Sequence, residues 1–376
     1  MTTDLPPAGA DSAEDRRYMQ LALNLGRRGL GRTWPNPAVG CVLVKDGIII
    51  GRGWTQPGGR PHAETEALKQ ARRGQARGAT LYTTLEPCSH QGQTPPCADA
   101  LIAAGVARVV SAMEDPNPEV AGQGHARLRD RNIAVEIGLC EAEARLAHAG
   151  HIRRIRDGRP HVMLKMAVSS DGKIAAGVRK RVEITGEAAR ERVFQMRATS
   201  DAILVGKGTV LADDPALTCR LPGMESWSPV RVVLNAKMNV PLASAVIATA
   251  RETPSWLVGS TAASAIAEEV LRGKGVEVLR AEAPDGLFDL QAVMKMLAGR
   301  GITRLMVEGG ASVAAALLKA DLIDEVLLFH GPKPIGDDGL GALDGLPLSA
   351  LTQAPNLHLV ASEQVGEDRL DHLVRR

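Results

Sequence analysis

The chain has 376 residues, of which 44% are hydrophobic and 23% are charged, and this length and composition indicate two globular domains rather than a disordered or fibrous protein. The net charge is only +2 and aromatic residues make up 2% of the chain, which excludes a general nucleic-acid binder with a basic surface and stacking platforms. No apolar run is long enough to cross a membrane and the acidic start lacks the pattern of a signal peptide, so we expect a cytoplasmic protein that binds neither membranes nor nucleic acid.

The first half of the chain alternates between helix-like and strand-like patterns. A flexible tail is expected at residues 1–15, followed by a helix at 16–28 and a hairpin of strands 39–44 and 48–54 around an Asp-Gly turn. The next predicted elements, in chain order, are a helix at 62–77, a strand at 80–84, a helix at 97–104, a strand at 108–113, a helix at 120–131, a strand at 133–137 and a charged helix at 141–156. Such alternation predicts a sheet layered with helices.

A Gly-Arg-Pro segment at 158–160 marks the expected boundary, which gives a first domain at residues 16–158 and a second at 159–376. The second domain has its own set of predicted elements. The strands are 161–168, 201–205, 230–234, 276–279, 304–307 and 324–329, and the helices are 187–199, 262–272, 290–297 and 311–319. This domain is therefore also predicted to be α/β.

Residues of the kinds that bind zinc occur at three places in the first domain. His62 begins a predicted helix, Cys88 follows a predicted strand, and Cys97 begins another helix. One imidazole and two thiolates suit a catalytic zinc ion with three protein ligands and an open fourth position. Glu64 is then free to take a proton from water and return it to a departing amine, which is the logic of the zinc deaminases.

Other interpretations of these residues exist. Taken singly, a Cys or a His is more often buried filler than a metal ligand. The five cysteines of the chain are few and odd in number, which argues against a disulfide framework. The loop between Cys88 and Cys97 is longer than in the usual deaminase pattern, but it is too polar to belong to a core, so the set favours a metal site. The motif alone also allows a deaminase of another nucleoside or base.

The segments around these residues resemble a known family. Residues 85–90 (Leu-Glu-Pro-Cys-Ser-His) and 94–97 (Thr-Pro-Pro-Cys), with flanking residues 35–42 and 115–118, are similar to the long-loop signature of the bifunctional riboflavin-biosynthesis deaminase-reductases. The resemblance implies a cytidine-deaminase-like three-layer α/β/α domain that hydrolytically deaminates 2,5-diamino-6-(5-phosphoribosylamino)pyrimidin-4(3H)-one. It also implies one zinc ion per chain, with Glu64 as the proton shuttle. The implied zinc ligands are His62, Cys88 and Cys97.

The same resemblance implies a substrate site around the pyrimidine and the ribose phosphate. It is made by Asn36, His90, Asp115 and Asn117. From the residues alone, Asn-Pro and Asp-Pro pairs are equally ordinary turn formers. One position departs from the family pattern, because Gln93 stands where a Lys or Arg is usual. A charge-assisted contact to the substrate phosphate is therefore missing or comes from elsewhere, for instance from Arg60.

The second domain has no G-x-G-x-x-G fingerprint after a strand, so spacing does not predict a standard dinucleotide fold. Its glycines lie differently. Gly206 and Gly208 follow a predicted buried strand, and the pair Gly309-Gly310 joins a strand to a helix whose N-terminal amides could hold a phosphate. Turns with two glycines are as often a sign of close packing.

Longer segments of this domain resemble the reductase half of the same family, namely residues 164–175, 200–206, 209–220 and 307–311. The resemblance implies a dihydrofolate-reductase-like α/β domain that uses NADPH to reduce the ribosyl C1′ of the deaminated product. The residues implied at NADPH are Ala167, Glu183, Thr209, Asp213, Gly310, Ala311, Ser312 and Val313. Those implied at the ribotide substrate are Lys165, Arg181, Arg197, Leu217, Arg220 and Glu308. Arg197 and Arg220 suit its phosphate.

Two positions in this half depart from the family pattern. Arg181 stands where a small hydroxyl residue is usual, and Glu183 stands where a Trp usually lies against the cofactor. A carboxylate there would repel the NADPH phosphates or would pair with the adjacent basic residues and do no harm. An active deaminase with an impaired or altered reductase is therefore an alternative interpretation. A regulatory protein with degenerate sites is a further one, which could apply only to this half. We also expect a homo-oligomer, either a dimer or a tetramer, that acts on small-molecule pyrimidine ribotides.

Overall fold

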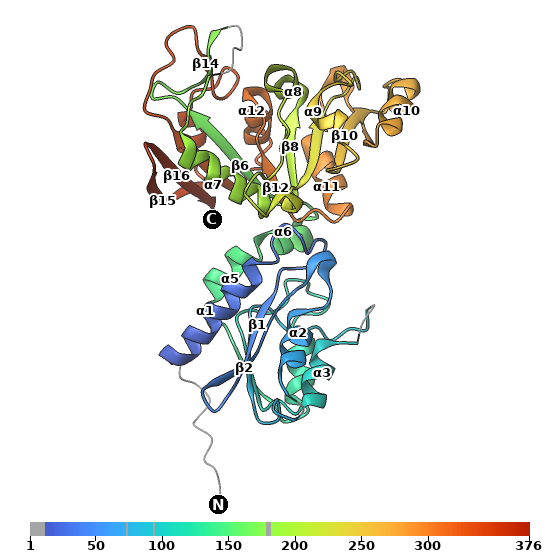
Figure 1. Ribbon diagram of the computed structural model, residues 1–376, viewed down its shortest axis with the longest axis vertical. Coiled ribbons are helices and arrows are strands. Elements are labelled where there is room, and N and C mark those ends of the chain that lie inside the picture. Colours follow the sequence, from blue (N-terminus) through green and yellow to red (C-terminus); the bar gives the residue numbers. More distant parts are fainter. Residues whose placement is uncertain (1–11, 73, 93–94, 178–181) are drawn as a thin grey trace, which may run out of the picture. The chain divides into compact units, whose positions relative to one another are not determined.

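The chain folds as two compact units, each with its own sheet and core (Figure 1). The computed structural model describes residues 12–72, 74–92, 95–177 and 182–376. The first unit ends at Asp157 and the second begins at Gly158. None of the helices in these ranges is long and apolar enough to cross a membrane. Both cores consist mainly of Val, Leu, Ile, Met and Ala.

The first unit is built on a five-stranded sheet with the strand order β2-β1-β3-β4-β5. Its strands are β1 (Gly40–Lys45), β2 (Ile48–Trp54), β3 (Thr80–Thr83), β4 (Arg108–Ser111) and β5 (Ala134–Ile137). The predicted hairpin joins β1 and β2, and its turn residues Asp46 and Gly47 both take left-handed backbone conformations. β1 pairs antiparallel with β3, whereas β3, β4 and β5 are parallel. The loops after β3 and β4 therefore meet at one edge of the sheet.

Helices cover both faces of this sheet. They are α1 (Ala13–Arg27), α2 (Ala63–Gln70), α3 (Cys97–Ala104), α4 (Gln123–Arg129), α5 (Glu141–Ala147) and α6 (Ala149–Asp157). A side chain on Gly40 would lie 2.0 Å from a carbonyl oxygen of α1, and one on Gly53 would lie 1.9 Å from a carbonyl oxygen of α2. Gly53 pairs with Cys41, the residue after Gly40, so these two glycines face opposite sides. The unit is therefore a three-layer α/β/α sandwich.

The helix boundaries of the first unit differ from the predicted ones in four places, the smallest being α4, which is shorter at both ends than the helix predicted at 120–131. α1 begins earlier than expected because the Ser12 hydroxyl caps it, accepting the amide of Asp15 over 3.0 Å. The helix predicted at 62–77 ends at Gln70, because the chain turns extended at Ala71 and then reaches a left-handed glycine at Gly74. The charged helix predicted at 141–156 is broken at His148, whose backbone leaves the helical region.

Two histidines lie around this break, the buried His148 and the partly buried His151. His148 Nε2 is 3.1 Å from the Thr84 hydroxyl, whereas neither ring nitrogen of His151 has a hydrogen-bond partner among the described residues. Burial lowers the pKa of His148 to about 3 and that of His151 to about 4. Both imidazoles are therefore neutral at neutral pH.

We expect the first unit to lose stability as the pH falls from 6.5, the ordinary pKa of histidine, towards about 4. In that window the unfolded chain binds a proton at His151 that the folded chain excludes, and above it both states are neutral, so the contribution is fully present. Between about pH 7.5 and 5 the free energy of unfolding of the parent protein should fall because His151 titrates. In His151→Phe, which carries an apolar ring instead of the imidazole, this fall should be smaller by about 2 kcal/mol. Urea unfolding of both proteins at these two pH values measures it. An equal loss in both would rule out His151 as the cause.

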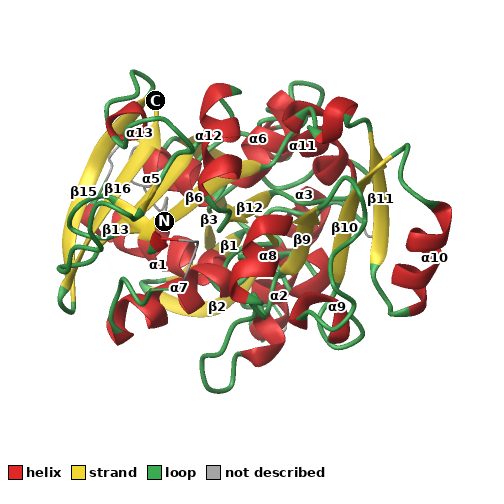
Figure 2. Ribbon diagram, turned by 90° about the horizontal axis from the view of Figure 1, so that it is seen from above, coloured by secondary structure: helices red, strands yellow, loops and turns green. Residues whose placement is uncertain are grey.

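The second unit is built on a nine-stranded sheet with the order β11-β10-β9-β8-β12-β6-β13-β16-β15. Its strands are β6 (His161–Val168), β8 (Ala202–Gly206), β9 (Val230–Leu234), β10 (Ser255–Ser260), β11 (Glu277–Ala281), β12 (Arg304–Val307), β13 (Glu325–His330), β15 (Leu357–Val365) and β16 (Asp368–Arg375). Figure 2 shows this row from β11 at one end to β15 at the other. The strands from β11 to β13 are parallel, and β16 and β15 add an antiparallel hairpin. A separate pair joins β7 (Lys173–Ala175) and β14 (Leu340–Gly341).

The chain reverses its direction across this sheet between β8 and β12. From β8 it moves outward through β9 and β10 to β11, and it then returns to β12 on the other side of β8. Right-handed crossovers put α8 (Lys207–Asp213) and α9 (Ala245–Ala248) on one face and α11 (Leu290–Gly299) and α12 (Ala311–Lys319) on the other (Figure 2). The other helices described are α7 (Glu187–Ala198), α10 (Ala265–Gly273) and α13 (Ser349–Thr352). Such a reversal leaves a crevice at the carboxyl ends of the strands, where α/β sheets bind ligands.

Candidate functional site

Three potential metal ligands meet at one edge of the first sheet. His62 precedes α2, Cys88 lies in the loop after β3, and Cys97 is the first residue of α3. Their ligand atoms lie within 4.8 Å of one another. His62 Nδ1 is 3.3 Å from Cys97 Sγ and 3.7 Å from Cys88 Sγ. One imidazole nitrogen and two sulfurs form the donor set of a catalytic zinc site, so these residues fit the predicted metal.

Glu64 lies beside this cluster on α2, with 3% of its surface exposed. Burial and the nearby Cys88 thiolate raise the pKa of its carboxyl group. The Cys97 thiol donates towards the Cys88 sulfur, which lowers the pKa of Cys88 to about 4 and raises that of Cys97. A buried carboxyl group with a raised pKa, next to a metal site, is suited to carry a proton in both directions.

The loops after β3 and β4 bring further predicted residues to the same edge. His90 follows Cys88 in the first loop, and Asp115 and Asn117 lie in the second. Asp115 is half-buried, and burial and the nearby charge of Glu86 raise its pKa, although the bond from the Asn117 amide acts in the opposite direction. The Asp115 carboxylate accepts the amide of Asn117 over 2.9 Å. These predicted residues therefore lie at the same edge of the sheet as the metal ligands.

Asn36 approaches the start of α2 from the segment before β1. Its side-chain amide donates to the Gly59 carbonyl oxygen over 2.8 Å, just before Arg60 and His62. Gly59 has a left-handed backbone, and a side chain there would lie 2.6 Å from the Asn36 amide nitrogen. The Arg60 guanidinium lies close to the loop between Cys88 and Cys97. Its Nη2 would be 3.5 Å from a Cβ atom placed on Gly92 of that loop. Gln93, where the family has a cation, lies outside the described residues.

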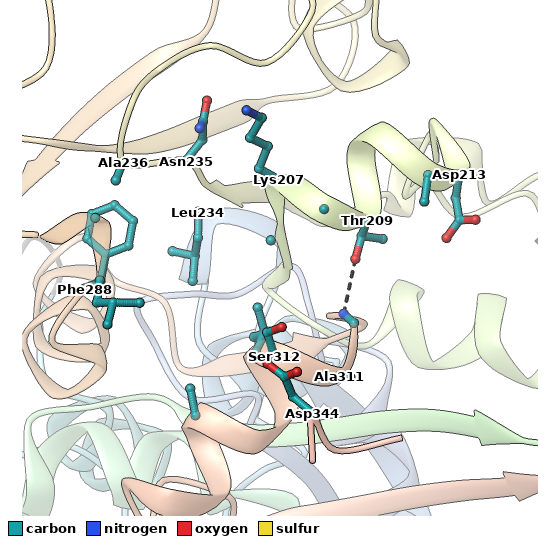
Figure 3. Close-up of a pocket in the computed structure, with 18 of the residues that line it drawn as sticks. Lys207, Thr209, Asp213, Leu234, Asn235, Ala236, Phe288, Ala311, Ser312 and Asp344 are labelled. Carbon is teal, nitrogen blue, oxygen red and sulfur yellow. Dashed lines mark hydrogen bonds between the residues drawn. The ribbon is translucent and has the colours of Figure 1, made fainter. Parts of the chain in front are cut away.

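The second unit holds a cavity of about 760 Å³ at the carboxyl ends of its parallel strands (Figure 3). Segments that follow β8, β9 and β12 line it, so it occupies the crevice where the chain direction reverses. The predicted cofactor residues that line it are Thr209, Asp213, Gly310, Ala311, Ser312 and Val313.

The start of α12 forms one wall of this cavity. Gly310 is its N-cap residue, no side chain caps the helix, and its first turn holds no acidic residue. The Gly310 amide donates to the Thr209 hydroxyl over 3.2 Å (Figure 3). A side chain on Gly309 would lie 2.7 Å from Val313, so only glycine allows the backbone this close. An uncapped helix start beside an open cavity fits a phosphate group of NADPH.

Four of the predicted substrate residues form one charged cluster. Arg197 donates from Nε and Nη2 to both oxygens of Glu308, over 2.7 and 2.9 Å, and from Nη1 to the Thr218 carbonyl oxygen. Burial alone would raise the pKa of the Glu308 carboxyl group. The positive charges of Arg197 and Lys165 have the larger combined effect, so the pKa of Glu308 lies below its usual value. Burial lowers the pKa of the Lys165 amine. Arg220 is exposed and stacks on Phe194, with 5.1 Å between its guanidinium carbon and the ring centroid.

Other predicted residues of this half lie differently. Neither Ala167 nor Glu183 is among the described residues that line the cavity. Ala167 packs against the core from β6, and Glu183 is exposed and pairs with Arg190 of α7. Leu217 is buried, with a left-handed backbone. Arg181 belongs to a segment that the structure does not describe.

Part of the cavity lining was not predicted from the sequence. Lys207, Asn235 and Phe288 line it, and the Asn235 side chain fixes the following turn by accepting the amide of Asn239 over 2.7 Å. Asn235 directly follows the buried run 230–234, and residues at the carboxyl ends of parallel strands face the ligand crevice. The position of Asn235 directly after a predicted buried strand is therefore the sequence signal that could have identified it as a cavity residue.

Comparisons with known proteins cover both units. Residues 12–113 match the family model of the cytidine and deoxycytidylate deaminase zinc-binding region, and residues 160–370 match that of the RibD C-terminal domain. The chain is 42% identical over 372 residues to the riboflavin biosynthesis protein RibD of Escherichia coli strain K12, a match that covers 96% of this chain and 99% of that protein. The chain belongs to the RibD family. RibD of Aquifex aeolicus is 40% identical over 354 residues, covering 94% of this chain and 96% of that protein.

Solved structures of RibD proteins match the whole fold. RibD of Acinetobacter baumannii has a TM-score of 0.85 at 37% identity, covering 96% of this chain and 99% of that one. The diaminohydroxyphosphoribosylaminopyrimidine deaminase/5-amino-6-(5-phosphoribosylamino)uracil reductase of Thermotoga maritima has a TM-score of 0.84 at 36% identity, with the same coverage. These matches confirm the predicted family and fold class. They also confirm the prediction of a bifunctional enzyme of riboflavin biosynthesis that depends on zinc and NADPH. Another kind of deaminase, an impaired reductase and a regulatory protein find no support.

Proposed function

We propose that this RibD-family chain deaminates 2,5-diamino-6-(5-phosphoribosylamino)pyrimidin-4(3H)-one in its first unit. The second unit then reduces the ribosyl group of the product with NADPH, which gives 5-amino-6-(5-phosphoribitylamino)uracil. The observation that carries the proposal is the cluster of His62, Cys88 and Cys97 with the buried Glu64 beside it. The relative from Thermotoga maritima, which matches both units, is named for both reactions.

In the deaminase, each residue has a role that its position supports. His62, Cys88 and Cys97 would hold a zinc ion, which when bound would act as a Lewis acid and lower the pKa of a water molecule. Glu64 takes a proton from the attacking water and delivers it to the amine, which leaves as ammonia. Substrate-binding roles fall to Asn36, His90, Asp115 and Asn117, which lie around the same edge.

In the reductase, NADPH supplies the hydride that the ribosyl carbon receives. Thr209, Asp213 and the glycine turn before α12 hold the cofactor along the cavity wall. Glu308 and Lys165, which lie close enough to interact, are the residues we assign to the ribotide, whereas the guanidinium of Arg197 already bonds Glu308 and a carbonyl oxygen. Arg220, which is exposed, is therefore better placed than Arg197 to meet the substrate phosphate.

Both reactions can be followed in one mixture of zinc-loaded protein, the diaminopyrimidine ribotide and NADPH. We expect ammonia release followed by loss of NADPH absorbance, and no NADPH loss when the ribotide is omitted. Ammonia release without NADPH loss would refute the reductase half of the proposal. Absence of both signals would refute the proposal that the diaminopyrimidine ribotide is the substrate.

Asp213→Ala should weaken the use of NADPH and leave ammonia release unchanged. Asp213 lines the cavity of the second unit, and loss of one hydrogen bond from an exposed carboxylate corresponds to a rise in the KM for NADPH of roughly 3- to 30-fold. Steady-state kinetics of both half-reactions measure the effect. A parallel loss of deamination would contradict the assignment of Asp213 to the cofactor alone.

We also propose that the protein works in the cytoplasm, as a homo-oligomer of two or four chains. All five cysteines are free, which suits a reducing compartment. The edge strand β15 leaves Leu359 and Val360 exposed, and an exposed apolar edge is a surface on which copies can pair. Sedimentation velocity of the purified protein tests the assembly, and a single monomeric species would refute it.

A further inference from the structure

A buried carboxylate in the first unit takes no part in the chemistry described above. Glu86 lies in the loop after β3, and 2% of its side chain is exposed. Its Oε2 accepts the backbone amides of Asp115 over 3.0 Å and Gly122 over 2.9 Å. Its Oε1 accepts those of Gly124 over 2.8 Å and His125 over 3.3 Å. Four amide donors are about as many as one carboxylate can accept.

The negative charge of Glu86 is balanced by these amides rather than by a cation. Among the described residues, its one ion-pair partner is His125, whose Nδ1 lies 3.8 Å from Oε2. Burial lowers the pKa of His125, so this imidazole is neutral at neutral pH. The bonds from Glu86 to the loop are therefore charge-assisted, and each is worth more than a bond between neutral groups.

These bonds clamp the loop after β4 and the first turn of α4 onto the segment that carries Cys88. The Glu86 amide itself donates to the Met113 carbonyl oxygen over 3.0 Å. Gly124 comes so close that a side chain there would lie 2.0 Å from the Pro87 carbonyl oxygen. On the other side of Cys88, Arg127 of α4 donates to the Ser89 carbonyl oxygen over 3.0 Å. The position of the loop relative to the metal ligand is thus fixed from both sides.

We propose that Glu86 is a positioning residue of the deaminase. It holds the backbone of Asp115 at a set place beside the metal ligands, so that the Asp115 carboxylate meets the pyrimidine ribotide. The effect extends one step further, because the Asp115 side chain accepts the amide of Asn117. The inference rests on the proposed function, in which Asp115 and Asn117 bind the substrate.

The test compares Glu86→Gln, Asp115→Asn and the double variant in the zinc-loaded full-length protein. Gln keeps the size of the side chain but turns an NH₂ group towards two of the four amides, which then lose their acceptor. Asp15→Asn is the matched control, because Asp15 is a buried carboxylate of the same unit that bonds Arg108 and has no bond to this loop. The measurements are the KM for the ribotide and kcat per bound zinc from ammonia release, with the KM for NADPH as an internal control.

We expect Glu86→Gln to raise the KM for the ribotide at least tenfold, with zinc content and the KM for NADPH unchanged. The double variant should be no worse than Asp115→Asn, because Glu86 acts through Asp115. A merely structural role would lower the active fraction in Glu86→Gln and leave KM unchanged, as expected for Asp15→Asn.

Three results would decide against the inference or its basis. If Asp115→Asn raises KM but Glu86→Gln leaves it within about twofold, Glu86 is not a positioning residue. Multiplying effects in the double variant would also overturn the inference, since the two residues would then act independently. An unchanged KM in Asp115→Asn would instead refute the substrate role of Asp115. If Glu86→Gln does not fold, Glu86→Asp, which keeps the charge and shortens its reach, replaces it in the same comparison.

Discussion

Glu64→Gln should lower the kcat of ammonia release by about 100- to 10,000-fold, the usual contribution of a general acid and base. Glu64 is buried beside the three metal ligands but does not belong to them, so the variant should keep one zinc ion per chain. The amide has the size of the carboxyl group but carries no proton between water and the leaving amine. Stopped assays of ammonia, together with zinc analysis of the same sample, measure both quantities.

Glu66→Gln is the matched control for this variant. Glu66 lies on the same helix, pairs with Lys69 over 2.6 Å and is partly exposed, so its loss should leave ammonia release within about twofold of the parent. The reductase half-reaction of Glu64→Gln, started from the deaminated product, should also be unchanged. Turnover retained in Glu64→Gln at the parent's zinc content would exclude the proton-carrying role.

The metal cluster could be predicted because each of its segments carries a local signal. His62 and Cys97 stand at helix starts, and Cys88 follows a strand, as the sequence indicates. The parallel pairing of β3 and β4 then brings the loops after both strands to one edge. The role of Glu86 could not be predicted in this way, because its partners are backbone amides of a distant loop and of the helix start that follows it, and these leave no mark on the sequence.

Some elements could not be predicted from the sequence, and each has its own physical reason. β10 is short and buried throughout, and such an apolar run cannot be told from a buried helix by its period. β15 is exposed over most of its length, so no alternation of polar and apolar residues marks it. The end of the helix predicted at 62–77 depended on the backbone of Ala71 and Gly74, while the apolar spacing before them continued to suggest a helix.

Arg197→Met should abolish the reductase and destabilise the second unit by about 3 to 5 kcal/mol, the usual cost of leaving one charge of a buried pair without its partner. Arg197 is 7% exposed and bonds both oxygens of Glu308, so the variant leaves this carboxylate without its bonded partner, with only the nearby charges of Lys165 and Arg220 to offset it. The Thr218 carbonyl oxygen also loses a donor. Urea unfolding and loss of NADPH absorbance with the deaminated ribotide measure the two effects, and ammonia release should persist.

A double variant separates the loss of chemistry from the loss of folding. Arg197→Met combined with Glu308→Gln removes both charges, so most of the stability should return, because neutral groups of similar size avoid the cost of a buried unpaired charge. The reductase should remain inactive, because an amide replaces the Glu308 carboxylate that we assign to the ribotide. Recovery of activity together with stability would show that the pair only supports the fold. Activity retained in the single variant would show that the orientation of Glu308 by Arg197 does not matter for reduction.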